Sequence, residues 1–219
     1  MKGPLACVST TTQPLATVTR CGCCSHCSTG PYERVPTDIF AGETLTEEFG
    51  RLNPVRETPV LELESGEVIV QSNAILWYLA EGTEFLPADA LGRAQTVQWL
   101  HFEQERIVYG IGAARFYTLT RRKPALIDAR VALGRSSLDV LDAHLADRNF
   151  VVGDVPTIGD LALFSYTHVA PDAGIELKTW PAVQSWIDRI EGLPGFVDDY
   201  VRYPDNAQPG RGRSIYDQR

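Results

Sequence analysis

The alternation of apolar and polar positions becomes regular only after residue 30, and the first elements it predicts are short. The sequence YERVPTDI has strand character, although Pro36 limits its pairing. PVLELE and EVIV alternate on either side of a turn at Ser65-Gly66, which predicts a β-hairpin. Between these strands, TLTEEFGRLN predicts a short amphipathic helix with Thr44 as its cap. These elements together predict a small α/β unit.

Helical periodicity dominates the rest of the chain. SNAILWYLAEG predicts a helix that Ser72 caps and Gly82 ends. A long apolar-periodic helix is expected over residues 91–118, and Pro124 opens another that runs to about Ala146. TIGDLALFSYTHV and PAVQSWIDRIEG predict two further helices. The second half of the chain is therefore expected to be all-helical.

The change of pattern divides the chain into five parts. Gly and Pro in EGTEFLPADA mark a natural linker, and the polar end, PDNAQPGRGRSIYDQR, is expected to be a loosely held tail. The expected parts are an anomalous segment at 1–30, an α/β domain at 31–80, a linker at 81–90, a helical domain at 91–200 and a tail at 201–219.

Charge and composition exclude several classes of partner. The 28 acidic residues outnumber the 20 basic ones and give a net charge of −8, which argues against nucleic acid or an anionic membrane. No apolar run approaches the roughly 20 residues that a membrane span needs. The start, MKGPLACVSTTT, lacks the apolar core of a secretion signal, and cysteine is absent after Cys27. A cytoplasmic location is expected.

Three stretches resemble the soluble, cytosolic-type bacterial glutathione transferases. They are RLNPVRETPVLEL, VIVQSNAILWYLAE and, in the helical half, FVVGDVPTIGDLALF. The resemblance runs from about Pro31 to about Tyr200 and depends on the order and spacing of the pieces. It implies an α/β plus all-α fold: a thioredoxin-like N-terminal domain, degraded here at its first strand and helix, followed by a C-terminal helical bundle domain. The family is usually dimeric.

The resemblance also implies a glutathione-binding site. In the family the bond before Pro59 is cis, and the backbone N–H and C=O of Thr58 would pair with the cysteinyl backbone of glutathione. Gln71 and Ser72 would bind the γ-glutamyl end, with the hydroxyl and the N–H groups at the helix start holding its carboxylate. Arg56 would meet the glycine carboxylate.

The same residues have ordinary structural explanations, which stay open at this point. Pro59 can simply start a strand, Ser72 can be a plain N-cap, and Arg56 can be a solvated surface arginine. Thr157 and Asp160 have the spacing of a capping box, and we interpret them as structural.

No metal site is expected from the charged and histidine residues. The four histidines are few and far apart. Glu103 and Glu105 are expected on the exposed surface of the long helix, although that helix lines the second-substrate pocket in the family.

Four of the five cysteines crowd into CGCCSHC, residues 21–27. Zinc usually takes four ligands in spaced pairs, and no predicted strand precedes the Cys21–Cys24 CxxC spacing, so neither a metal nor a redox site is favoured. Because cysteine codons are TGT or TGC, the junctions Cys23–Cys24 and His26–Cys27 both force leucine in a displaced reading frame.

Permitted codon choices extend this displaced reading. Residues 8–30 can spell LYDYPASGNCYKVRLLLTLLDR, which runs straight into PYERV. This reading contains a strand, an SGN turn and a leucine-rich helix, the elements that the family has before this point. We hypothesise that the chain up to about Gly30 is translated out of frame.

The function implied by the resemblance is a glutathione transferase of detoxification type. Glutathione is the co-substrate, and its thiolate would attack a small electrophile in an apolar pocket. The catalytic residue would fall in the displaced segment, so none is named. A homodimer is implied. Two alternatives remain: a non-catalytic glutathione-transferase-like interaction module, or the inactive product of a frameshifted gene.

Overall fold

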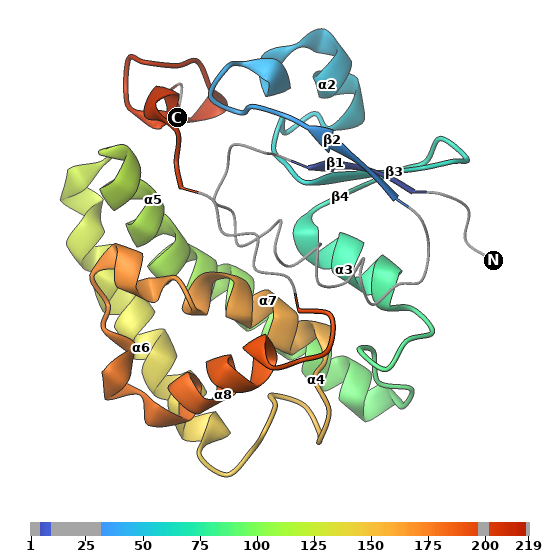
Figure 1. The fold of residues 1–219 in the computed structure, drawn as a ribbon, viewed down its shortest axis with the longest axis vertical. Helices are drawn as coiled ribbons and strands as arrows, with labels where there is room; N and C mark the ends of the chain where they lie inside the picture. The colour runs from blue at the N-terminus through green and yellow to red at the C-terminus, as the bar shows by residue number, and fades with distance from the viewer. Residues whose placement is uncertain (1–4, 10–31, 197–201, 218–219) are drawn as a thin grey trace. The chain divides into compact units, whose positions relative to one another are not determined.

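The computed structural model describes residues 5–9, 32–196 and 202–217. The chain forms two units: unit 1 comprises Met1–Leu79 with Val197–Arg219, and unit 2 comprises Ala80–Phe196 (Figure 1). The expected linker, 81–90, falls in the first part of unit 2. The cysteine stretch and nearly all of the proposed displaced segment lie outside the described residues.

Unit 1 contains a four-stranded mixed sheet in the order β2-β1-β3-β4. β1 (Leu5–Ser9) pairs parallel to β2 (Tyr32–Pro36) and antiparallel to β3 (Val60–Leu63), and β3 pairs antiparallel to β4 (Val68–Val70). The expectation that the first strand is lost is therefore wrong. A ladder is built from backbone groups that nearly every residue carries, so a stretch without strand periodicity can occupy it.

The first helical elements of unit 1 lie where the sequence predicts them, but the N-cap is two residues later than expected. A 3₁₀ turn, η1 (Glu43–Leu45), leads into α2 (Glu47–Leu52). The cap is Thr46, whose Oγ1 accepts from the Phe49 N–H at 3.2 Å, and not Thr44 as predicted. Thr44 lies inside the 3₁₀ turn and is fully buried, whereas Thr46 has the extended backbone that an N-cap requires.

Unit 2 is helical throughout its described elements. Among the described residues, no helix is both long and apolar enough to cross a bilayer. The principal helices are α4 (Ala90–Phe102), α5 (Ala113–Thr120), α6 (Ile127–Leu145), α7 (Ile158–Thr167) and α8 (Pro181–Glu191), and short 3₁₀ turns are η3 (Pro124–Leu126), η4 (Ala170–Ala173) and η5 (Leu177–Thr179).

The long helix predicted for 91–118 is continuous but contains a ten-residue π-helical segment, η2 (Glu103–Gly112). Here η2 lies against α6: a Cβ added to Gly110 would stand 2.7 Å from the backbone nitrogen of Gly134. Glu103, expected at the solvated surface, is fully buried, while Glu105 is exposed as predicted. The prediction for Glu103 is wrong because this residue shares a helix face with the buried Trp99, Leu100 and Ile107, which lie three or four residues away along the chain.

The C-terminal strap, defined here as residues 202–217, is packed onto unit 1 rather than loosely held. It contains the short turns η6 (Asp205–Ala207) and η7 (Ile215–Asp217). Ala207, Ser214 and Ile215 are buried. Figure 1 shows the strap, in red, beside the segment that joins β2 to α2. Composition alone indicated a polar tail, but three small or apolar residues anchor it.

Candidate functional site

The β3–β4 hairpin brings the two predicted binding motifs together. Val60 pairs with Val70, and the register runs antiparallel from there. Pro59 directly precedes Val60, and Gln71 directly follows Val70, so the two motifs leave the ladder at the same end. Two motifs that are about a dozen residues apart in the sequence therefore meet at one end of the hairpin, where α3 (Ser72–Ala80) begins.

The Thr58–Pro59 peptide bond is cis, as expected from the resemblance. Pro59 is buried, whereas Thr58 is only half-buried. Thr58 precedes β3, so its backbone lies beyond the described β3–β4 ladder. A ligand with an extended backbone could pair with such a position as an added strand.

Asn53 shapes the loop that leads to Thr58, a role that the sequence reasoning missed. It is 2% exposed. Its Nδ2 donates to the Glu57 carbonyl at 2.7 Å, and its Oδ1 accepts from the Val55 N–H at 3.1 Å. Its carbonyl accepts from the Arg56 N–H at 2.9 Å. An Asn just after a helix and before a Pro, as in RLNP, is a typical signal for such a turn.

Arg56 is fixed to the start of α2. Its Nη1 donates to the carbonyls of Thr44, at 3.1 Å, and of Thr46, at 2.5 Å. Its backbone has φ 62, the left-handed region that favours glycine. A direct contact with a glycine carboxylate would therefore have to use guanidinium nitrogens other than Nη1.

Gln71, rather than Ser72, occupies the cap position of α3. Its carbonyl accepts the first helical hydrogen bond from the Ile75 N–H at 3.0 Å, and its φ is 74. Ser72 is the first residue of the helix. Gln71 is exposed and Ser72 half-buried, while Ile75 and Leu76 are fully buried. The buried face of α3 thus anchors the helix, and the dipole at its start favours an anion.

The predicted capping box at α7 is confirmed, and it extends further than the sequence indicated. The carboxylate of Asp160 accepts from Thr157 N at 2.8 Å and from Thr157 Oγ1 at 3.0 Å. It also accepts from Val151 N at 2.9 Å and from Trp186 Nε1 at 3.0 Å. Burial raises the pKa of the Asp160 carboxyl, against these hydrogen bonds, which lower it. The group is structural.

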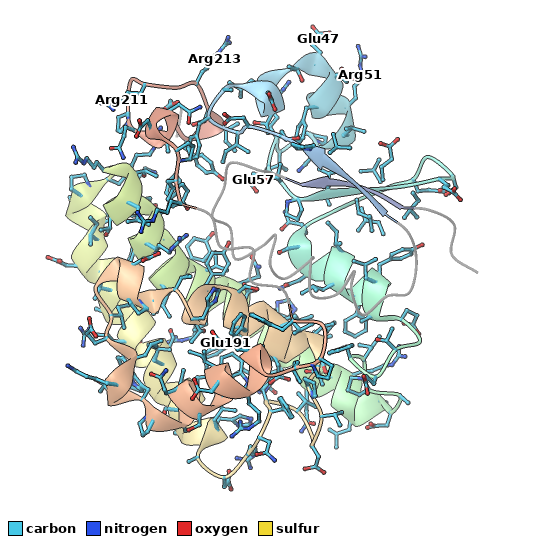
Figure 2. All side chains as sticks on the ribbon, in the orientation of Figure 1. Glu47, Arg51, Glu57, Glu191, Arg211 and Arg213 are labelled. Atoms are coloured by element: carbon cyan, nitrogen blue, oxygen red, sulfur yellow. The ribbon has the colours of Figure 1, made fainter. Side chains whose placement is uncertain are left out.

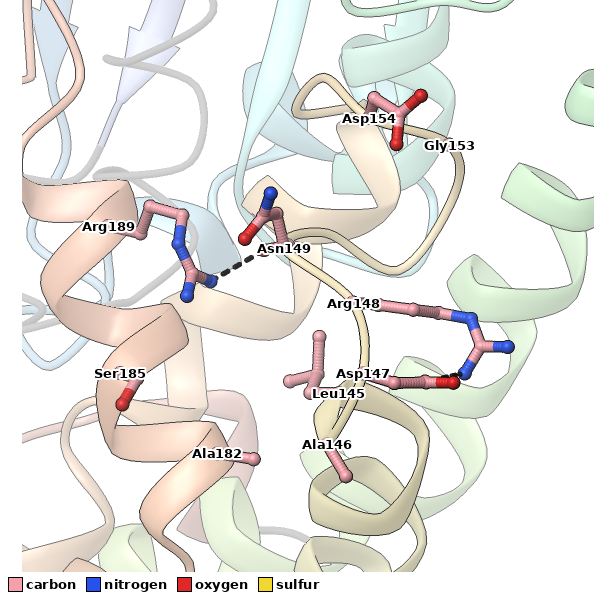
Figure 3. Close-up of a pocket in the computed structure, with 10 residues that line it drawn as sticks. All are labelled: Leu145, Ala146, Asp147, Arg148, Asn149, Gly153, Asp154, Ala182, Ser185 and Arg189. Atoms are coloured by element: carbon pink, nitrogen blue, oxygen red, sulfur yellow. Dashed lines mark hydrogen bonds and ion pairs between the residues drawn. The ribbon is translucent and has the colours of Figure 1, made fainter.

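A separate cavity of about 340 Å³ lies in unit 2 near the end of α6 (Figure 3). Both arginines that line the cavity make hydrogen bonds within the chain. Arg189 Nη1 donates to the Asn149 carbonyl at 2.7 Å, and Arg148 Nη1 donates to Asp147 Oδ1 at 2.5 Å. The lining residues are Leu145, Ala146, Asp147, Arg148, Asn149, Gly153, Asp154, Ala182, Ser185 and Arg189.

Within the described part of the chain, no group of three or more His, Cys, Asp or Glu side chains is arranged to hold a metal ion.

Two protein-family descriptions match the chain. The description "Glutathione S-transferase, N-terminal domain" matches residues 24–81, and "Glutathione S-transferase, C-terminal domain" matches residues 105–194. Together they cover more than half of the sequence, in the predicted order.

Known proteins agree. The crystal structure of a glutathione S-transferase from Xanthobacter autotrophicus Py2 is 34% identical, has a TM-score of 0.83, and covers 88% of this chain and 95% of its own. Glutathione S-transferase 3 of Zea mays is 30% identical over 79% of this chain and 83% of its own length. Elongation factor 1-gamma of Equus caballus is 33% identical over 58% of this chain and 30% of its own.

A more distant structure carries the ligand. A glutathione transferase homologue from Lodderomyces elongisporus, 22% identical with a TM-score of 0.80, covers 90% of this chain and 97% of its own and was solved with two glutathione molecules per subunit. The expected architecture, a thioredoxin-like domain followed by a helical domain, is confirmed by these comparisons.

Proposed function

The chain belongs to the glutathione S-transferase family, and on that premise we propose that it binds glutathione and transfers its thiolate to small electrophiles. The observation that supports the proposal is the Val60–Val70 pair of the hairpin, because Thr58-Pro59 directly precedes Val60 and Gln71-Ser72 directly follows Val70.

Each part of this end of the hairpin has a distinct role in the proposed site. The N–H and C=O of Thr58 pair with the cysteinyl backbone of glutathione, with Pro59 setting the direction of entry into β3. The Ser72 hydroxyl and the start of α3 hold the γ-glutamyl carboxylate. The Gln71 amide hydrogen-bonds the same end of the ligand. Arg56 contributes positive charge toward the glycine carboxylate.

The proposed reaction is a nucleophilic substitution or addition. Glutathione loses its thiol proton to solvent, and the thiolate forms a carbon–sulfur bond with the electrophile. In a substitution, the leaving group departs with the electron pair of the broken bond. The group that stabilises the thiolate belongs to the segment before Pro31, so no catalytic residue is assigned. A homodimer in the cytoplasm is part of the proposal, and light scattering on the purified chain tests the dimer.

A second candidate function is a non-catalytic interaction module. The observation that favours it is the similarity to elongation factor 1-gamma, a relative of which this chain spans only 30%. The accessible Gln71-Ser72 pair favours the glutathione-binding alternative, because a module that binds only protein has no need of a carboxylate site at that position.

The displaced-frame hypothesis stays a proposal and bears directly on activity. If it holds, the chain as printed lacks the turn and helix that stabilise the thiolate, and a frame-restored gene encodes the active enzyme. The nucleotide sequence across codons 6–31 decides it. An intact frame through codon 30 would end the hypothesis.

The central test is calorimetric titration of the purified chain with glutathione, followed by a thiol-conjugation assay on both the printed and the frame-restored proteins. Binding by both, with conjugation only or mainly by the restored protein, is the expected result. Absence of glutathione binding by the restored protein would contradict the proposed function. Binding without conjugation of any tested electrophile would favour the interaction module.

A further inference from the structure

The C-terminal strap contacts the segment between β2 and α2 at several points. Asn206 Nδ2 donates to Asp38 Oδ2 at 3.0 Å, and the Arg213 N–H donates to the Phe40 carbonyl at 2.8 Å. Ala41 and Arg213 form a parallel β-bridge. The Phe40 ring, fully buried, meets the Tyr203 ring edge-on with centroids 6.1 Å apart.

Gly212 shows how closely the strap is fitted. A Cβ built on it would stand 2.4 Å from the carbonyl oxygen of Phe40 and 2.4 Å from that of Asn206. Both neighbours are backbone atoms, which cannot move aside as a flexible side chain would. Any side chain at this position therefore separates the strap from the 38–41 segment. Arg211 and Arg213, labelled in Figure 2, flank Gly212 and are exposed.

The segment that the strap holds continues directly into the candidate site. Asp38 Oδ1 accepts from the N–H groups of Phe40, at 2.8 Å, and of Ala41, at 3.0 Å, and the Asp38 N–H donates to Glu43 Oε2 at 2.6 Å. This network positions the start of η1. The carbonyls of the following residues, Thr44 and Thr46, are the two groups that Arg56 Nη1 grips.

Arg56 links η1 to the loop that presents Thr58. It belongs to the turn that Asn53 organises through the Glu57 carbonyl, one residue before Thr58. A guanidinium gripping two carbonyls from ten and twelve residues earlier leaves the loop little freedom. Hydrogen bonds and short stretches of chain therefore connect Asn206 and Gly212 to Glu57, the residue before Thr58.

We propose that the C-terminal strap is a positioning element for the 53–58 loop, acting through the 38–46 segment and Arg56, and so tunes the affinity of the site for a γ-glutamyl tripeptide. The ligand named in this inference rests on the proposed function. The positioning of the 53–58 loop by the strap does not depend on it. The strap residues do not touch the ligand. They act by holding the geometry of the backbone that does.

The test compares two glycine-to-alanine variants of the full chain. Gly212→Ala places a methyl group 2.4 Å from two carbonyl oxygens, whereas Gly192→Ala, in unit 2, places it at ordinary contact distances of 3.4 and 3.6 Å. Hydrogen–deuterium exchange is measured on peptides covering 38–46, 53–58 and α3. Glutathione affinity is measured by calorimetry.

We expect Gly212→Ala to speed exchange in 38–46 and 53–58 but not in α3, and to weaken glutathione binding about five- to tenfold. Gly192→Ala should change neither. If Gly212→Ala does not fold, Asn206→Ala, which removes only the donor to Asp38, is expected to give the same pattern at smaller amplitude.

Two results would overturn the inference. Unchanged exchange in 38–46 would mean that the strap does not hold this segment. Faster exchange in 38–46, with 53–58 and the affinity unchanged, would mean that the strap is only structural. If neither the unaltered nor the frame-restored chain binds glutathione, the proposed function fails, but the exchange comparison still decides whether the strap holds the 38–46 and 53–58 segments.

A double-mutant cycle separates the proposed route from general destabilisation. If the strap acts through Arg56, Gly212→Ala adds little to the loss of affinity already caused by Arg56→Gln. Fully additive losses would contradict the route through Arg56.

Discussion

One helix in each unit, α7 in unit 2 and α3 in unit 1, begins beside polar residues. These residues are buried at α7 but partly exposed at α3. At α7 in unit 2, Thr157 is 1% exposed, Asp160 is fully buried, and the carboxylate accepts four hydrogen bonds from within the unit. At α3 in unit 1, Gln71 is exposed with φ 74, and Ser72 is half-buried.

In the proposed site the start of α3 binds a ligand, whereas the start of α7 stabilises the fold. The polar groups at the start of α7 all have partners within unit 2, so they stabilise the fold. At α3 the exposed Gln71 holds a left-handed backbone conformation that costs roughly 1–2 kcal/mol of stability.

The largest effect expected is on the buried helix start. Asp160→Asn turns an amide NH₂ toward donors, so at least one buried N–H or O–H loses its acceptor. We expect the free energy of unfolding to fall by roughly 2–4 kcal/mol, measured by denaturant titration. Glutathione affinity of the folded protein should change less than twofold. A loss below 1 kcal/mol would mean that the α7 network contributes little.

At the start of α3 we expect a large change in glutathione affinity and a small change in the free energy of unfolding. Ser72→Ala should weaken glutathione binding about tenfold, equivalent to roughly 1.4 kcal/mol, because the carboxylate loses a hydroxyl donor. The free energy of unfolding should fall by about 1 kcal/mol or less. Thr157→Ala is the matched control, and it should lower stability without altering affinity. Equal affinity in Ser72→Ala and the unaltered chain would remove Ser72 from the site.

Backbone strain offers a sharper comparison. Gln71→Gly should raise the free energy of unfolding by about 1 kcal/mol, since glycine adopts positive φ without penalty, while weakening glutathione binding. Arg121, with φ 56 at the end of α5, is the control: Arg121→Gly should stabilise similarly and leave binding unchanged. Thermal denaturation and calorimetry measure the two quantities. A Gln71→Gly variant that binds normally would show that the amide plays no part.

The smallest effect that we expect is a change with pH in the free energy of unfolding. Because burial raises the pKa of folded Asp160 above its unfolded value of about 3.9, the folded chain holds that proton more tightly. Its contribution to stability is therefore greatest below about pH 3.9 and declines as the pH rises through the folded pKa. The stability advantage of the unaltered chain over Asp160→Asn should narrow over that range in denaturant titrations. If the stability advantage of the unaltered chain widens as the pH rises, the pKa of folded Asp160 is lowered and not raised.

Local signals in the sequence predicted most elements, whereas the identity of the site residues stays a prediction. The hairpin, α3 and the α7 capping box depend on alternation, a Ser-Gly turn and a three-residue spacing, all of which act within a few positions. Errors arose where a local signal occurred twice. Thr44 and Thr46 both fit a cap, and only the extended backbone of Thr46 distinguishes them.

Elements without a local pattern escaped prediction. Leu5–Ser9 forms one of the two inner strands of the sheet through backbone pairing with β2 and β3. Its place does not follow from periodicity, because it depends on which distant chain segments lie alongside it.

The sequence by itself determined the order of the elements, the family resemblance and the residues at the start of α3, since spacing and residue type are written in the chain. Only the tertiary structure decided that Arg56 grips the start of α2 and that residues 202–217 close against Phe40. Those contacts join positions 10 to more than 160 residues apart, and hydrogen bonds over such separations are selected by packing rather than by local preference.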